Sequence, residues 1–550
     1  MRRGRRGINW VRIRFSNARL QERSFDRKGA SAQPLIIRQK DVVMQYFSYL
    51  DESALDRIHE ASLEILEDVG LLVRNKKARD RFAEHGAAVD ETNERVRIPA
   101  DVVMRYLALV PPTITLRGRD PKFDVTFPRK LPVVATASSA PDIVDPVTGL
   151  TRRATSQDIA RLGHVVNELD GFDVFSISVL ADDAPEGHFN LSRFYPALKN
   201  CLKPVRTSVV SVDEARQILK LGELIAGSPE AFWERPFINF GYCSIVTPLT
   251  MDFDSTENLM FFAENGVTAY GTVAPIGGIN TPLSLPGMMV MVNAEWLATM
   301  CLAQMSRERT ELIYNFLPVF ADLRDGAYAP GAIEVGMMNS IVCQMARRYN
   351  VPAGGYLGLT NSKVSDAQAG YEKGMSPLLG ALSGVDFIVM GGLLDALMSL
   401  DFGQLAIDNE IAKMVKVVRA GVEFSEEALA IDDIKRIGPA GIFADAPMTL
   451  ENMTTATFMP ELADRKLRET WEEQGASTIH QRALNKSMAI LTRQPNPAAL
   501  TPEADARIKA HFPGIVAGDS SLPDGWVPAE TGPTAPVRAR RQSRRRNAPG

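Results

Sequence analysis

The sequence predicts an α/β protein, a (β/α)8 TIM barrel with an N-terminal helical domain and basic tails. Three observations predict it. After residue 130, short β-branched or apolar runs alternate with longer amphipathic stretches, eight such pairs follow one another, and each connection is long. Long connections favour parallel pairing of neighbouring strands. Eight parallel units favour closure into a barrel.

The repeating units can be placed on the chain. Strands are expected at 132–137, 173–179, 204–210, 237–244, 267–273, 311–317, 352–358 and 385–391. Helices are expected at 156–169, 188–198, 212–225, 255–263, 287–305, 333–349, 366–382 and 403–418. An open doubly wound sheet is the competing architecture, but the Gly-rich phosphate turn expected after its first strand is missing.

A helical domain is expected before the barrel, over residues 44–130. Asp51 is an N-cap candidate, and Gly70 and Gly86 each follow an amphipathic stretch, as helix-terminating glycines do. The expected helices run through 50–69, 78–85 and 104–109, and a strand-rich exit covers 113–127. The barrel itself is then expected over 131–425, and a C-terminal helical extension over 426–516.

The charge is concentrated at the two ends of the chain. Residues 1–40 carry twelve Lys or Arg and two acidic residues, and residues 517–550 carry six Arg and three acidic residues. Because the whole chain has a net charge of -4, residues 41–516 carry -17. We therefore expect disordered basic tails at 1–43 and 517–550 around an acidic body. Binding of the tails to nucleic acid or a membrane surface, or a true start at Met44, are the alternatives.

Several classes of protein are disfavoured. The longest apolar run, 385–400, is interrupted by Gly and Asp, and no signal peptide is recognisable, so a soluble protein outside the secretory route is expected. The four cysteines stand far apart, which indicates a reducing compartment, and none has zinc-site spacing to another cysteine or a histidine. We expect a cytoplasmic protein with no metal of its own and no nucleic-acid or membrane partner.

The active site of a barrel lies at the carboxyl ends of its strands, where the βα loops converge. The candidates there are Ser138, Ser139, Asp142, Tyr242, Thr247, Tyr270, Thr272, Asn315, Phe316, Asp322, Tyr328, Tyr356, Thr360, Asn361 and Lys363. The loop 354–374 is dense in polar residues, more so than a turn requires, and favours a binding site. The loop 274–287 is rich in Gly and Pro, which is equally compatible with a ligand-binding loop and with a tight turn. The segment 401–415 is expected to be mainly a helix that faces the core.

Six blocks of this sequence resemble the trimethylamine:corrinoid methyltransferase family. They are 57–73, 141–155, 248–267, 274–304, 354–374 and 401–415, and the resemblance runs from about Leu50 to about Val516. It implies a barrel catalytic domain. Founding members of the family carry pyrrolysine, and the equivalent position lies near Leu359, within 358-GLTNSK-363. Leu359, Thr360 and Asn361 are therefore the candidate catalytic residues.

The sequence departs from the founding pattern in two places. Leu359 is an ordinary side chain, and 307-RERTELIY-314 stands where the family leads a Gly-Pro pair into the sixth strand. The chain thus resembles the pyrrolysine-free branch, whose members demethylate betaines and related quaternary amines. A quaternary ammonium already has a neutral amine as its leaving group, so no activating adduct is needed.

What such a substrate needs is a water-poor cage, because aromatic faces hold a cation at about 0.5–2 kcal/mol per contact. The candidate substrate-binding residues are Tyr242, Tyr270, Phe316, Tyr328, Tyr356 and Lys363. For the carboxylate of a betaine, Asn361, Lys363 and Thr360 are candidate donors.

The resemblance implies that the methyl acceptor is the cobalt of a corrinoid (cobalamin) carried by a partner protein. The chain has no cobalamin-ligating Asp-x-His-x-x-Gly run of its own. We expect a homo-oligomer. Two alternative functions remain open: a Schiff-base lyase or aldolase acting through Lys363, and a non-catalytic betaine-binding or corrinoid-docking module.

Overall fold

The computed structural model describes residues 46–528, apart from 244, 423, 454 and 496–499. The predicted tail at 1–43 lies outside the described residues, as does most of the predicted tail at 517–550.

Eight parallel strands form a closed ring. In ring order they are β6 (Val133–Ala135), β9 (Phe175–Ser176), β10 (Val205–Thr207), β11 (Ile238–Cys243), β13 (Ala269–Thr272), β15 (Tyr314–Phe316), β18 (Ala353–Tyr356) and β19 (Phe387–Val389). β19 pairs with β6 and closes the ring, and single bridges join β6 to β9 and β13 to β15. Every strand lies within its predicted range, so the barrel is confirmed and the open sheet is excluded.

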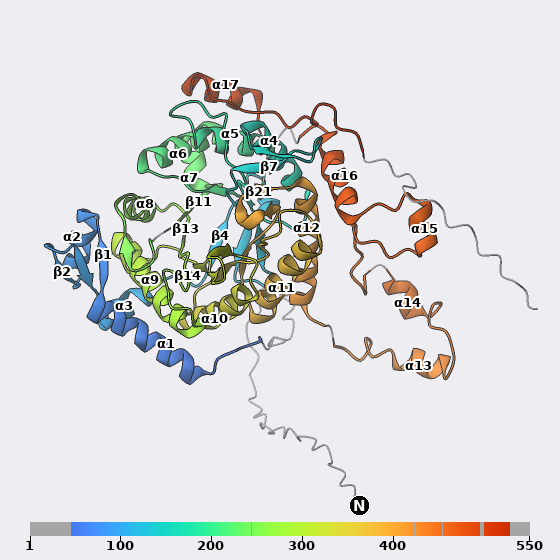
Figure 1. Cartoon of the computed structure of the whole chain (residues 1–550), viewed down its shortest axis with the longest axis horizontal. Coiled ribbons are helices and arrows are strands. Elements are labelled where there is room, and N and C mark those ends of the chain that lie inside the picture. The colour runs from blue at the N-terminus through green and yellow to red at the C-terminus, as the bar shows by residue number, and fades with distance from the viewer. Residues whose placement is uncertain (1–45, 244, 423, 454, 496–499, 529–550) are drawn as a thin grey trace, which may run out of the picture. The chain divides into compact units, whose positions relative to one another are not determined.

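A helix follows each strand and covers the outside of the ring (Figure 1). These helices are α4 (Ser156–Glu168), α5 (Leu191–Asn200), α6 (Val212–Ala226), α8 (Phe253–Glu264), α9 (Leu285–Ser306), α10 (Ile333–Tyr349), α11 (Ala367–Ser383) and α12 (Phe402–Ala420). Five of them begin at a side-chain N-cap that accepts a backbone N–H in the first turn: Thr155, Ser211, Asp252, Asp366 and Asp401. Such caps fix where each βα loop ends.

The segment before the barrel is mixed rather than helical. Its helices are α1 (Glu52–Glu64), continued by a π-helical turn (Ile65–Val69), α2 (Lys76–Glu84) and α3 (Ala100–Leu107). Its strands are β1 (Leu71–Val73), β2 (Ala88–Asp90) and β3 (Arg95–Arg97), joined by β12 (Thr250–Met251) from the fourth βα loop. The prediction of a helical domain with a strand-rich exit missed this sheet because strands of three residues show no periodicity.

A hairpin follows and leads into the barrel. It consists of β4 (Ile114–Leu116) and β5 (Val125–Phe127). The ring of Phe127 stacks on that of Phe387 with centroids 5.6 Å apart, so the hairpin packs against the barrel core.

The segment after the barrel contains short helices. These are α13 (Ile431–Ile437), α14 (Pro447–Asn452), α15 (Arg468–Glu473), α16 (Ile479–Leu491) and α17 (Pro502–His511). α16 packs on both α12 and α4. The Asp401 carboxylate, 2.8 Å from Nε2 of His480, ties α16 to the start of α12. The exact domain boundaries stay predictions.

α9 is long and apolar enough to pass for a membrane-spanning helix by length and composition. Most of it is buried in the protein, where it packs on α1, α3 and α8.

Candidate active site at the mouth of the barrel

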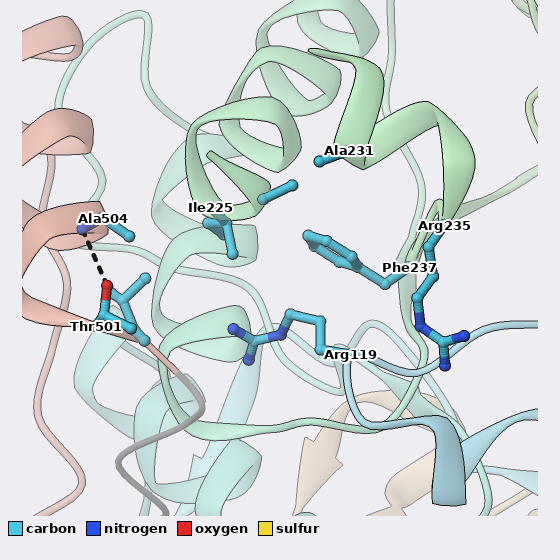
Figure 2. A pocket seen from close by; sticks show the side chains of 9 residues that line it. Arg119, Ile225, Ala231, Arg235, Phe237, Thr501 and Ala504 are labelled. Atoms are coloured by element: carbon cyan, nitrogen blue, oxygen red, sulfur yellow. Dashed lines mark hydrogen bonds between the residues drawn. The ribbon is translucent and has the colours of Figure 1, made fainter. Parts of the chain in front are cut away.

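Not every cavity of the protein lies where barrel chemistry is found. One cavity of about 240 Å³ lies between α6, α17 and the turn before β11, lined by Arg119, Phe237 and Thr501 among others (Figure 2). Phe237 precedes the first residue of β11, so this cavity is at the amino end of the strands. The carboxyl ends of the strands, where barrel enzymes act, are at the opposite end.

The inner face of the barrel can be identified from contacts across the ring. The rings of Tyr270 (β13) and Phe387 (β19) stack with centroids 5.5 Å apart, although two strands separate β13 from β19. Both side chains therefore point inward. Because neighbours along a strand face opposite sides, Tyr270 and Thr272 share the inner face.

Two predicted cage residues point the other way. Tyr242 and Phe240 of β11 both contact the ring of Phe262 on α8, at 5.7 and 4.8 Å between centroids. Phe316 lies 4.6 Å from Tyr314, whose hydroxyl donates to Oδ1 of Asn293 on α9. The structure thus places Tyr242 and Phe316 between the barrel wall and its helices.

Two other predicted aromatic residues belong to the mouth, Tyr356 at the end of β18 and Tyr328 in the loop after β15. A Cβ on Gly355 would point at Asn339 of α10, so Gly355 faces outward and Tyr356 faces inward. Burial raises the pKa of Tyr328 to about 12, and the hydroxyl of Tyr356 and the thiol of Cys243 add to the shift.

Cys243 is the last residue of β11. It follows the outward-facing Tyr242, points inward and is exposed. The surrounding protein nevertheless raises the pKa of the Cys243 thiol, and the carboxylate of Asp252 adds to the effect. A thiol kept protonated is a poor nucleophile, so the site does not favour cysteine-based covalent catalysis.

The predicted loop after β18 is held rigidly. Oε2 of Glu372 accepts from the Thr360 hydroxyl at 2.5 Å and from the Asn361 N–H at 2.9 Å. The Asn361 amide donates to the carbonyl of Tyr328 at 2.8 Å and accepts from the N–H of Gly331 at 3.1 Å. Thr360 and Asn361 therefore use their polar atoms to fix the loop and to position Tyr328.

A small cavity adjoins this loop on the rim. It measures about 280 Å³ and lies between α10 and α11, where Gly331, Tyr371, Glu372 and Met375 contribute to its lining.

A buried ion pair fixes the same loop from below. Nζ of Lys373 lies 2.9 Å from Oδ2 of Asp408 and also donates to the carbonyl of Gly358 at 3.0 Å. Asp408 accepts from the N–H of Gly392, after β19, at 2.6 Å. The seventh and eighth βα loops are thus tied to one another.

The remaining predicted residues differ in exposure. Leu359 is a buried hydrocarbon side chain with no polar atom. Lys363 is largely exposed, and its Nζ donates to the carbonyl of Asn361 and lies 3.5 Å from Asp395. A Schiff-base lysine acts from a desolvated pocket or beside another cation, and Lys363 has neither surrounding.

Sequence reasoning missed three polar residues on the inner face. Arg206 of β10 lies with its guanidinium carbon 5.1 Å from the centroid of Tyr270 and 5.5 Å from that of Phe387. In the strand register Arg206 pairs with Ser176 on one side and Asn239 on the other, so all three share the inner face. The detectable signal was a charged residue inside the apolar strand 204–210.

A buried carboxyl supports the loop after β11. Glu295 of α9 accepts from the Thr247 hydroxyl at 2.9 Å and from the Leu249 N–H at 2.7 Å. Burial raises the pKa of Glu295 to about 7, and the two hydrogen bonds oppose that shift only in part. Among the described residues, no group of three or more His, Cys, Asp or Glu is arranged to hold a metal ion.

The sequence matches a known protein family over most of its length. The profile of the family described as trimethylamine methyltransferase (MTTB) matches residues 15–512. A trimethylamine methyltransferase of Desulfitobacterium hafniense is 30% identical over 444 residues, covering 80% of this chain and 88% of that protein. A glycine betaine methyltransferase of the same species is 30% identical over 467 residues, covering 84% and 96%.

A solved structure is also similar at lower identity. The monomethylamine methyltransferase of Methanosarcina barkeri has a TM-score of 0.49 and 14% identity, covering 86% of this chain and 89% of that one.

Proposed function

Because the chain belongs to the trimethylamine methyltransferase family, we propose that it transfers a methyl group from a small quaternary or tertiary amine, such as a betaine, to the cobalt of a corrinoid protein. The observation that carries the proposal is the mouth of the barrel, where Tyr356 faces inward at the end of β18 and Asn361 of the following loop holds the Tyr328 backbone at 2.8 Å. Aromatic faces bind quaternary ammonium groups without a counter-charge.

The nature of the residue at position 359 favours quaternary over simple tertiary amines. Leu359 has no functional group that forms an adduct with an amine, and its side chain is buried. A quaternary ammonium needs no such adduct, because it leaves as a neutral amine. The task of the protein is then to desolvate the cation and to aim one methyl group out of the barrel, and such positioning supplies most of the acceleration.

The corrinoid of the partner supplies a reduced cobalt nucleophile. For the partner to dock, the mouth must offer a surface to it. All eight βα loops carry at least one large apolar side chain that is exposed: Val147, Leu150, Phe189, Val210, Val246, Ile279, Leu283, Leu323, Val364 and Met398. Contiguous exposed apolar patches mark protein-binding surfaces, and these ten side chains all belong to loops at one end of the barrel. We call this set the apolar rim and propose that the corrinoid protein docks on it.

The free state of all four cysteines accords with a reducing, cytoplasmic setting, which we propose for the protein.

The direct test is turnover. The purified chain is mixed with a reduced corrinoid protein and, in turn, glycine betaine, proline betaine, carnitine, choline and trimethylamine, and methylation of the corrinoid is followed by its absorbance. We expect methylation with at least one quaternary amine and none with trimethylamine. No spectral change with any quaternary amine would refute the proposal. Borohydride trapping of a carbonyl substrate at Lys363 would support the lyase alternative instead.

A further inference from the structure

Arg206 is a buried cation without an ion-pair partner among the described residues. It is 2% exposed, and neither its Nε nor its Nη1 has a hydrogen-bond acceptor. Burying a charged group without hydrogen bonds is strongly unfavourable. Nε and Nη1 of Arg206 are therefore available to donate to an acceptor that is not part of the chain.

The residues that flank Arg206 repeat this pattern. On β11, Nδ2 of Asn239 is buried and has no acceptor, and on β9 the Ser176 hydroxyl is buried and unpartnered. By register the three residues form one row across three adjacent strands, all on the inner face. Four hydrogen-bond donors thus gather at one level of the barrel.

Other buried arginines show what a structural guanidinium looks like in this protein. Arg79 pairs with Glu91 at 2.9 Å and with Glu94 at 3.1 Å. Arg193 donates to Asn190, Ser139 and Thr207 and to the carbonyl of Ser208. Nε of Arg193 has no partner either, but both of its terminal nitrogens donate to groups of the fold, whereas Nε and Nη1 of Arg206 are both unpartnered.

The surroundings orient the Arg206 guanidinium. The rings of Tyr270 and Phe387 lie against it, and Phe127 of the entry hairpin stacks on Phe387. A Cβ on Gly241 would come within 2.7 Å of Nη2, so the absence of a side chain there gives the guanidinium its space. Aromatic rings offer the guanidinium no anionic acceptor.

We infer that Arg206, with Asn239 and Ser176, binds a carboxylate, so that the amine substrate is a zwitterion bearing both a quaternary ammonium and a carboxylate group. The inference rests on the proposed function and names its substrate class. Arginine suits this task because its planar fork matches the two oxygens of a carboxylate.

The spacing along the strands fits a short zwitterion. Cys243 stands two residues beyond Gly241 on β11, and Tyr356 pairs in register with Val389, two residues beyond Phe387 on β19. Two residues of a strand span roughly 6.6 Å. The carboxylate would lie at the level of Arg206, and the cation about one small molecule further out, at Tyr328 and Tyr356.

The test compares ligands that share a cation and differ in the carboxylate. Binding of glycine betaine, choline and sodium acetate to the full chain is measured by titration calorimetry. The variants are Arg206→Gln and Asn239→Asp, which puts an isosteric carboxylate beside the guanidinium. Arg216→Gln, at an exposed arginine of α6 that pairs with Asp213 and lies over the ring of Phe261, is the matched control.

We expect the wild-type chain to bind glycine betaine at least about tenfold more tightly than choline, which corresponds to about 1.4 kcal/mol. Acetate should compete with betaine. Both inner-face variants should abolish the preference, and Arg216→Gln should keep it. Because Asn239→Asp supplies a partner to a buried cation, its Tm should not fall, which separates loss of binding from misfolding.

Equal affinities for betaine and choline, no carboxylate binding by the wild-type chain, or a preference that survives Asn239→Asp would overturn the inference. Its failure is distinguishable from that of the proposed function. If choline methylates the corrinoid equally well with the wild-type chain and with Arg206→Gln, the proposed function holds and the carboxylate site is wrong. If betaine binding depends on Arg206 but no amine methylates the corrinoid, the carboxylate site holds and the proposed function is wrong.

Discussion

Nζ of Lys373 and Oδ2 of Asp408 lie 2.9 Å apart, and neither side chain is exposed to solvent. A buried ion pair is costly to assemble, and removing one partner leaves an uncompensated charge. Here the pair also satisfies backbone groups of Gly358 and Gly392, so its loss affects two of the loops at the mouth.

We therefore predict that Lys373→Met lowers the free energy of unfolding by about 3–5 kcal/mol. Urea denaturation followed by circular dichroism measures the change. Lys363→Met is the control, because Lys363 makes an exposed pair with Asp395 and should cost less than about 1 kcal/mol. Equal effects of the two substitutions would show that the buried pair does not stabilise the loops.

The inward and outward aromatic residues should differ in function. Tyr356→Leu removes an aromatic face at the mouth and should weaken binding of the quaternary amine by about 1–2 kcal/mol, roughly five- to thirty-fold. Tyr242→Leu should leave the affinity unchanged and lower only the stability, because Tyr242 packs against Phe262 of α8. Titration calorimetry with glycine betaine measures both. An affinity loss confined to Tyr242→Leu would reverse the assignment of the two faces.

Glu295 should make stability depend on pH. Its folded-state pKa of about 7 lies above the value of about 4.3 for an unfolded glutamate, so the folded protein binds the proton more tightly. The free energy of unfolding should therefore fall by about 3 kcal/mol as the pH rises from about 4.3 to about 7, and this group should add no further change above that.

The measurement compares urea denaturation of the wild-type chain and Glu295→Gln across that pH range. The difference between the two proteins should shift by about 3 kcal/mol in favour of the variant as the pH rises. Glu84→Gln, at an exposed residue of α2, controls for the loss of a charge. A difference that does not vary with pH would exclude titration of Glu295 in this range.

The apolar rim should affect the protein partner and not the amine. Leu323→Glu and Ile279→Glu place charges on two of its loops, where both side chains are 64% exposed. We expect the apparent KM for the corrinoid protein to rise about tenfold or more, with the amine affinity unchanged. Val422→Glu, at an exposed residue beyond the end of α12, should change neither. Unaltered kinetics in both rim variants would place the docking surface elsewhere.

The order and type of the barrel elements were predictable because each crossover is long and each helix is amphipathic. The sequence did not predict whether a given strand residue faces the inside or the outside of the barrel. Strands buried on both sides are apolar throughout and carry no alternation, so Tyr242 and Tyr270 looked equivalent in the sequence. The contacts that separate them, to Phe262 of α8 and to Phe387 of β19, join residues that the sequence does not relate.

The inner row of donors was hidden for a similar reason. Arg206 was visible as a charge within a predicted strand, but its significance depends on the absence of an acceptor, which only the assembled barrel shows. The small sheet beside the N-terminal segment was hard to predict for a second reason, because one of its strands, β12, is supplied by a barrel loop far along the chain.

The ring of strands closes where β19 pairs with β6, and the registered partners Phe387 and Val133 are far apart in the chain. During synthesis at about 5–20 residues per second, β6 leaves the ribosome roughly 10–50 s before its final neighbour. Throughout that interval its outer edge has backbone hydrogen-bonding groups open to any other strand. Production of this protein in a foreign host is therefore expected to depend on chaperone supply and on slow translation at low temperature more than on the stability of the finished barrel.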